Sequence, residues 1–144
     1  MSVPDKKVVI QTLSQKFKCH FKAIKRKQIM FEGINNGKKI IICTPSSKIH
    51  AQGNGWFDLN TKQVAILDEA EFAVLAVRLE GKKIYYVDFK ELKRLMTPEV
   101  ICENYAEGKH WKLFVWETYI QIQGNDQKFN VQPQIVTVDY NVIN

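Results

Sequence analysis

The sequence predicts a mixed α/β domain in which a central mixed β-sheet is flanked by helices. Two observations favour this class. Apolar residues recur at helical spacing near the N-terminus, whereas residues 72–79 form a nearly continuous apolar run, typical of a strand buried on both faces. Helix-like and strand-like segments also alternate along the chain, as in helices packed on a sheet. A length of 144 residues suits one domain, so we expect a single domain over residues 1–144.

The first half of the chain predicts helices and a hairpin. The helices are expected over 5–18 and 61–69, and the hairpin strands over 28–34 and 39–44. Asn35-Asn36-Gly37 joins the two strands, because asparagine and glycine tolerate a positive φ. Pro45 ends the second strand, since it has no N–H to donate. Asn60 is the expected N-cap of the second helix.

The second half predicts four more strands and a helix. The strands are expected over 72–79, 83–87, 111–123 and 136–143, and the helix over 89–96. Asp88 is suited to cap this helix, and Thr97-Pro98-Glu99 predicts another helix start. Residues 136–143 alternate apolar and polar side chains, which predicts a strand with one face in water.

Charge favours a polyanionic partner. The formal net charge is +6 at pH 7, and residues 16–27 hold six basic side chains and no acid. Lysine and arginine neutralise backbone phosphates and release counterions, so this segment is a candidate nucleic-acid contact. An ordinary solvated surface is the alternative. The six residues are Lys16, Lys18, Lys22, Lys25, Arg26 and Lys27.

The polar loop after Pro45 is a second candidate contact. Its hydroxyl, amide, imidazole and ammonium groups suit phosphates or base edges, although a solvated loop explains them equally well. The residues are Ser46, Ser47, Lys48, His50, Gln52 and Asn54. We expect Trp56, Trp111 and Trp116 to pack in the core rather than stack on bases, because each lies in an apolar context.

Other classes of site and location are disfavoured. Three widely spaced cysteines and three scattered histidines give no metal-ligand spacing. No apolar run approaches the roughly 20 residues of a membrane span. The N-terminus lacks the apolar core of a signal peptide. We therefore expect a cytoplasmic protein that has no membrane partner.

Several segments between Met30 and Trp116 together resemble the PD-(D/E)XK superfamily, which has the restriction-endonuclease-like fold. They are Phe31-Glu32, the Asn35-Asn36-Gly37 turn, IIICTPSSK, the aromatic segment 53–59, FAVLAVRL, KIYYVDF and HWKLFV. The resemblance implies that fold, with DNA as the partner. It also implies an origin in a phage, a mobile element, or a restriction or defence system.

The family's chemistry needs two carboxylates that hold a divalent cation, and a lysine at the same phosphate. The resemblance assigns the first carboxylate to Glu32. It assigns the second to Ile41 or Ile42, and the lysine to Cys43 or Thr44, and none of these four residues can do this work. Either the metal site is eroded, or its catalytic groups have migrated. In the second case Glu32 would hold Mg²⁺, with Lys48 and an acid from Asp58 or Glu71.

The sequence therefore predicts a nucleic-acid-binding protein on a nuclease-like scaffold with an eroded metal site and no cofactor. One alternative is an active Mg²⁺-dependent DNA endonuclease that uses the migrated groups. Another is a protein-interaction subunit or inhibitor, which recruits a second copy or another protein through the 136–143 strand. An unpaired strand edge is a template for such pairing.

Overall fold

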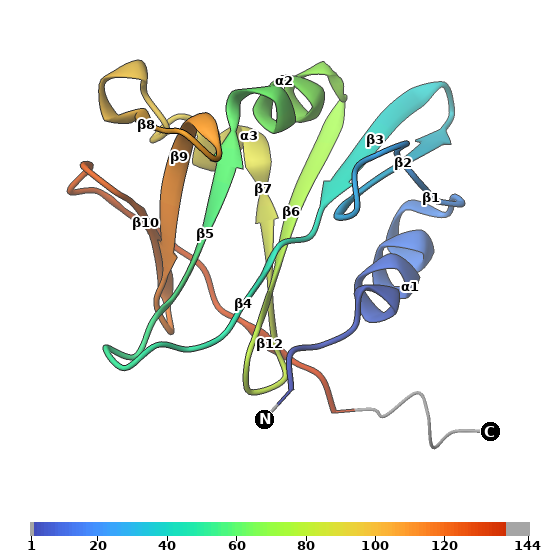
Figure 1. Cartoon of the computed structure of the whole chain (residues 1–144). Coiled ribbons are helices and arrows are strands. Elements are labelled where there is room, and N and C mark those ends of the chain that lie inside the picture. Colours follow the sequence, from blue (N-terminus) through green and yellow to red (C-terminus); the bar gives the residue numbers. More distant parts are fainter. Residues whose placement is uncertain (1, 138–144) are drawn as a thin grey trace.

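The structure, a computed structural model, describes residues 2–137 and has a mixed α/β fold, as the sequence predicts (Figure 1). Its helices are α1 (Lys6–Phe17), α2 (Thr61–Glu69) and α3 (Phe89–Lys93), with one 3₁₀ turn, η1 (Pro98–Val100). None of the helices in residues 2–137 has the length and apolarity needed to cross a membrane.

The strands form two sheets where the sequence predicts one central sheet. The first has the order β1 (Lys22–Ala23), β2 (Met30–Asn35), β3 (Lys38–Cys43), β6 (Phe72–Leu79), β7 (Lys83–Asp88) and β12 (Gln134–Ile135), and β4 (Ser46–Ser47) pairs with β6. It is mixed, because β3 and β4 are parallel to β6 while the other pairs are antiparallel. The second has the order β11 (Lys128–Asn130), β10 (Tyr119–Ile122), β9 (Gly108–Val115) and β5 (Gly55–Asn60), and β8 (Cys102–Asn104) pairs with β9.

Local signals in the first half of the chain are confirmed. The Asp5 side chain accepts a hydrogen bond from the Lys7 N–H at the start of α1. Asn60 and Gln63 form a reciprocal capping box that satisfies two free N–H groups at the start of α2. Asn36 and Gly37 have φ values of 53° and 75°, which are the positive values expected for the hairpin turn.

The prediction of one long strand over 111–123 is wrong. The chain reverses between β9 and β10, and the Trp116 N–H donates to the Tyr119 carbonyl oxygen at 2.8 Å across a turn formed by Glu117 and Thr118. The inward apolar positions shift from Leu113 and Val115 before the turn to Ile120 and Ile122 after it, which is the one trace of the turn in the sequence. Neither turn residue is Gly, Pro or Asn, so the usual turn signal is absent there.

Three other predicted elements differ from the structure. The helix predicted over 89–96 ends at Lys93, and its last residues continue only as tight turns. The helix start at residue 97 leads to the single turn η1, in which the Thr97 side chain makes no cap hydrogen bond. The polar loop after Pro45 contains the short strand β4. The strand predicted over 136–143 lies outside the described residues, except for its first two residues, Val136 and Thr137.

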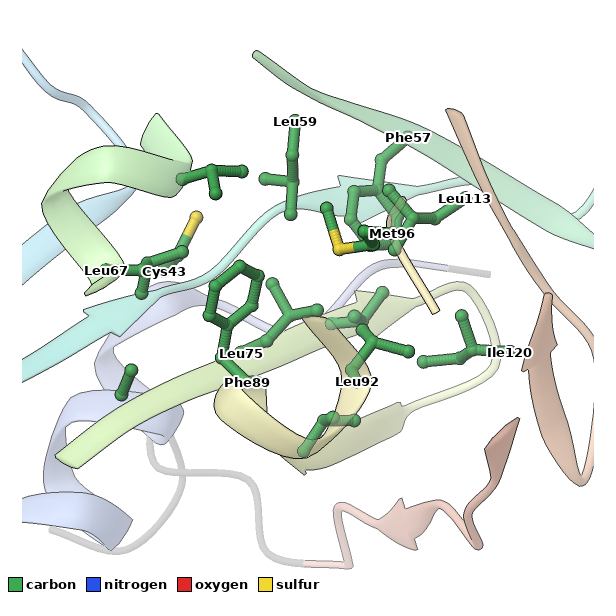
Figure 2. Packing of buried hydrophobic residues seen from close by; sticks show 14 of the residues in the cluster. Cys43, Phe57, Leu59, Leu67, Leu75, Phe89, Leu92, Met96, Leu113 and Ile120 are labelled. Atoms are coloured by element: carbon green, nitrogen blue, oxygen red, sulfur yellow. The ribbon is translucent and has the colours of Figure 1, made fainter. Parts of the chain in front are cut away.

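The first sheet is buried on both faces. One face packs against the second sheet, α2 and α3, and Figure 2 shows Cys43 and Leu75 of the first sheet in this core with Leu59 and Leu113 of the second. The other face packs against α1 in a smaller core. Side chains alternate between the two cores along β3, because successive residues of a strand point to opposite faces. Burial of each large apolar side chain contributes about 1.5–3 kcal/mol.

Arg78 is a buried cation inside β6. It is 8% exposed and lies level with Ser46 of β4. Its Nε donates to Thr44 Oγ1 at 2.9 Å, and its Nη2 donates to the Thr44 carbonyl oxygen at 2.8 Å. Its Nη1 donates to the Pro4 carbonyl oxygen at 3.1 Å. Burial lowers the pKa of Arg78, and the charge of Asp5 opposes this. Arg78 therefore joins the segment before α1 to the irregular chain after β3.

Candidate nucleic-acid interface

Glu32 is half-buried, whereas the positions that the nuclease resemblance assigns to the second carboxylate and to the lysine lie inside the protein. Ile41, Ile42, Cys43 and Thr44 are each 0–1% exposed. Ile41 faces the core between the sheets and Ile42 the core under α1. Burial raises the pKa of Cys43 to about 12, so this thiol is neutral at ordinary pH. None of the four is open to water or to a phosphate.

The alternative catalytic residues are not brought together. Glu32 on β2 lies opposite Ile41 of β3, and Glu71 precedes β6, so two strand spacings, or roughly 10 Å, separate their backbones. Lys48 follows β4, which pairs with the opposite end of β6, roughly 25 Å from Glu71 along the strand. Asp58 belongs to the second sheet. Within residues 2–137 there is no group of three or more metal-binding His, Cys, Asp or Glu side chains.

The basic segment, residues 16–27, lies at the C-terminal end of α1, in β1 and in the turn that follows. Phe21 is 5% exposed and anchors the segment in the core under α1. Five of the six basic side chains are exposed and Lys27 is half-buried. The one ion pair in residues 2–137 joins Lys93 and Asp68, so none of these six cations is paired there. Their charge is free for an anionic ligand.

The polar loop divides into structural and exposed members. Ser47 Oγ donates to the Lys48 carbonyl oxygen at 2.7 Å and accepts from the Trp56 N–H at 3.0 Å. Asn54 is 4% exposed and donates to the Gly55 carbonyl oxygen at 3.1 Å. These two side chains hold the loop against β5. The exposed members are Ser46, Lys48, His50 and Gln52.

The outer surface of the second sheet carries a row of aromatic side chains, which we name the aromatic face: Trp56, Phe114, Trp116 and Tyr119. Trp56 lies opposite Phe114 in the register of β5 and β9. The Trp116 and Tyr119 rings stack with their centroids 6.1 Å apart and their planes at 22°. Trp56 is 39% exposed, and the other three rings are half-buried.

The expectation that the tryptophans are core residues holds for Trp111 alone. This side chain is 6% exposed, and its Nε1–H donates to the Thr97 carbonyl oxygen at 3.0 Å. The sequence of β5 contains a signal that the Trp56 ring points outward, because Trp56 comes directly before the alternating apolar residues Phe57 and Leu59. Once those two point into the core, Trp56 must point outward.

Cations and amides surround the aromatic face. Lys112 Nζ lies 4.2 Å from the centroid of the Trp56 ring, and Lys128 Nζ lies 4.5 Å from that of Tyr119. His50 of the polar loop stacks on Trp56 with centroids 6.0 Å apart and planes at 24°. A cavity of about 280 Å³ opens beside Phe114 and Trp116 of the aromatic face. Its lining residues are Gln52, Asn54, Phe114, Trp116, Gln121, Ile122, Gln123 and Gly124.

The basic segment and the aromatic face lie at opposite sides of the molecule. In Figure 1, α1 and β1 are at one side and β9 and β10 at the other, with β6 and β7 between them. Comparison of the chain with protein-family models, curated proteins and solved structures finds no match in any of the three.

Proposed function

We propose that this protein binds nucleic acid, with DNA as its partner, and that it does so without cutting it. The observation that carries the proposal is the exposure of the basic segment without ion-pair partners in residues 2–137. A cytoplasmic location is part of the proposal, because all three cysteines are unpaired, as is usual in a reducing compartment.

Phosphate contact explains why six cations are held together. Lysine and arginine side chains placed near one another repel, and nearby carboxylates usually offset this. Here Glu32 lies opposite Lys22 in the register of β1 and β2, and no ion pair joins the two. A row of phosphates would relieve the repulsion and release condensed counterions, which is the main source of affinity in sequence-independent binding.

Burial supports binding without cutting. A metal-dependent nuclease must keep its carboxylates and its cation open to water and to the phosphate. The side chain of Ile41 lies in the core between the sheets, where a carboxylate would be cut off from solvent. This burial favours the proposal over the endonuclease alternative, which would need Glu32 and Lys48, placed toward opposite ends of β6, to converge with an acid.

Salt dependence of DNA binding tests the proposal. Each phosphate neutralised on duplex DNA contributes about −0.9 to the slope of log K against log salt concentration. Replacing three exposed cations of the basic segment, in Lys22→Gln/Arg26→Gln/Lys25→Gln, should make that slope shallower by roughly 2–3. Fluorescence anisotropy with a labelled duplex from 50 to 200 mM salt measures it.

A matched control removes the same charge elsewhere. The variant Lys62→Gln/Lys82→Gln/Lys90→Gln loses three exposed lysines that lie outside the basic segment. It should leave the slope within about one unit of the wild-type value. Equal effects of the two triple variants would show that net charge alone attracts DNA, and a flat salt dependence would contradict phosphate contact.

The same samples separate the alternatives. Linear and circular duplexes incubated with Mn²⁺ or Mg²⁺ should stay intact. Cleavage that Glu32→Ala abolishes would overturn the proposal in favour of the endonuclease. If duplex DNA, single-stranded DNA and RNA all remain unbound, the protein-interaction alternative takes its place.

A further inference from the structure

We propose that the aromatic face is a stacking surface for unpaired bases of single-stranded DNA. This rests on the proposed function and names the form of DNA that the second sheet would take. Bases in a duplex hide their faces inside the helical stack, so exposed aromatic rings can pair face to face only with unpaired bases. Aromatic side chains on an open sheet or groove are a recurrent solution for single-stranded nucleic acids.

The geometry places two stacks within reach of one short strand. The first consists of His50 and Trp56, and the second of Trp116 and Tyr119. Trp56 lies on β5 and Tyr119 on β10, with β9 between them, so two strand spacings and one pair of residues along the strand separate them. That is roughly 12 Å between backbones. Phe114 lies between the stacks and continues the apolar surface.

The lysines are placed to meet phosphates once bases bind. Lys112 and Lys128 now lie over the Trp56 and Tyr119 rings. Base stacking on an aromatic ring is worth more than a cation–π contact at an exposed site. An arriving base should therefore displace the ammonium group, which remains beside the ring where the phosphate of the same nucleotide passes.

The cavity beside the rings suits one base. Its volume of about 280 Å³ lies just below the range of about 300–1,000 Å³ for small-molecule sites. Gln52 lines it and can both donate to and accept from base edges. Gln121 also lines it; its Nε2 donates to the Asn125 carbonyl oxygen at 3.0 Å, and its Oε1 can accept from a base. Phe114 and Trp116 supply the apolar wall. The face therefore combines ring surfaces, edge-reading amides and cations.

The charge of the face favours nucleic acid over a protein partner. Lysine is depleted in the cores of protein interfaces, where its charge would be buried. On this face two lysines lie over the Trp56 and Tyr119 rings. The acid Asp58 lies opposite Lys112 on β9 but makes no ion pair with it.

Binding of a labelled 15-nucleotide single strand and of a duplex, measured by anisotropy, tests this inference. Trp56→Ala should weaken single-strand binding by about tenfold, within a range of about five- to 150-fold, because it removes one stacking platform. Duplex affinity should change less than twofold. Trp56→Phe should keep most of the single-strand affinity, and Tyr119→Leu should lower it while leaving the Trp56 stack in place.

The matched control is Tyr105→Ala, which removes a fully exposed aromatic ring outside the face. It should leave both affinities unchanged. Saturating single-stranded DNA should also quench tryptophan fluorescence, with a smaller quench in Trp56→Phe. Thermal unfolding of each variant checks that the fold is retained.

Several results would overturn the inference. These are an unchanged single-strand affinity in both Trp56→Ala and Tyr119→Leu, an equal loss for duplex and single strand, or no quench at saturation. RNA of the same sequence bound more than tenfold tighter than DNA would overturn the assignment to DNA.

The experiment separates this inference from the proposed function. If duplex binding depends on the basic segment while the aromatic variants change nothing, only the stacking inference fails. If single-strand binding depends on Trp56 and not on the basic segment, the stacking inference stands. The proposal that the basic segment contacts phosphates then fails. If no nucleic acid binds, both fail.

Discussion

Arg78→Met should destabilise the protein strongly, although it replaces a charged side chain with an apolar one of similar length. Arg78 is 8% exposed and makes three hydrogen bonds, two to Thr44 and one to Pro4. Methionine fills the space but donates nothing. Three buried acceptors then lose their partner: the Thr44 hydroxyl, the Thr44 carbonyl and the Pro4 carbonyl.

The magnitude follows from those three acceptors. Each buried acceptor left without a donor costs about 1–3 kcal/mol, and the avoided desolvation of the guanidinium offsets part of the sum. We expect a net loss of about 3 kcal/mol in the free energy of unfolding. In a domain of this size that lowers the melting temperature by about 10 °C. Arg78→Lys should recover little, because an ammonium group lacks the planar fork that reaches all three acceptors.

Urea unfolding followed by far-UV circular dichroism measures the loss. Arg94→Met is the matched control, because Arg94 is exposed and its side-chain hydrogen bond within residues 2–137 is a long contact of 3.4 Å from Nε to the Glu91 carbonyl oxygen. It should change stability by less than about 0.5 kcal/mol. A loss below about 1 kcal/mol in Arg78→Met, or one equal to the control, would refute the claim that Arg78 joins the N-terminal segment to the sheet.

Three further changes test the packing. Asp58→Thr should raise stability by about 1 kcal/mol, because the Asp58 Oδ1 atom is buried and has no hydrogen-bond partner among residues 2–137, and because threonine suits a strand; a lower melting temperature would contradict this. Gly55→Ala should lower stability by about 2 kcal/mol, since its new methyl group would collide with Leu79 and lie 2.9 Å from Ser47 Oγ; unchanged urea unfolding would count against it. Stability should fall as pH rises above 9, because the Cys43 thiol ionises near 9.0 when unfolded but has a pKa of about 12 when folded. Cys43→Val should remove about 1.4 kcal/mol of this decline per pH unit, and parallel pH profiles for the two proteins would contradict it.

Local elements of the fold could be predicted from the sequence because their signals are local. Asp5 and Asn60 cap α1 and α2 with their own side chains. The Asn36-Gly37 turn follows from the conformational freedom of two adjacent residues. Each of these signals acts within a few residues, so no knowledge of the rest of the chain is needed.

The second sheet could not be predicted in the same way. It forms because Gly55–Asn60 pairs with His110–Val115, and about fifty residues separate the two partners in the sequence. Nothing in either strand specifies the other beyond an apolar inner face. The aromatic face depends on that pairing, since Trp56 meets Phe114 only across it. The basic segment, by contrast, is contiguous in the chain, and composition alone revealed it.

Function therefore has to be argued from exposed surfaces rather than from the nuclease-like pattern of apolar positions. Ile41 and Cys43 contribute to the core between the sheets, and a carboxylate or an ammonium in their place would be buried without a partner. Such burial costs several kcal/mol per charge against a typical total stability of about 5–15 kcal/mol. A metal site on β3 would therefore lower the stability of the core, whereas the exposed charges of the basic segment and the rings of the aromatic face bury no charge in it. Since one scaffold can host many activities, these two surfaces are where binding should be sought.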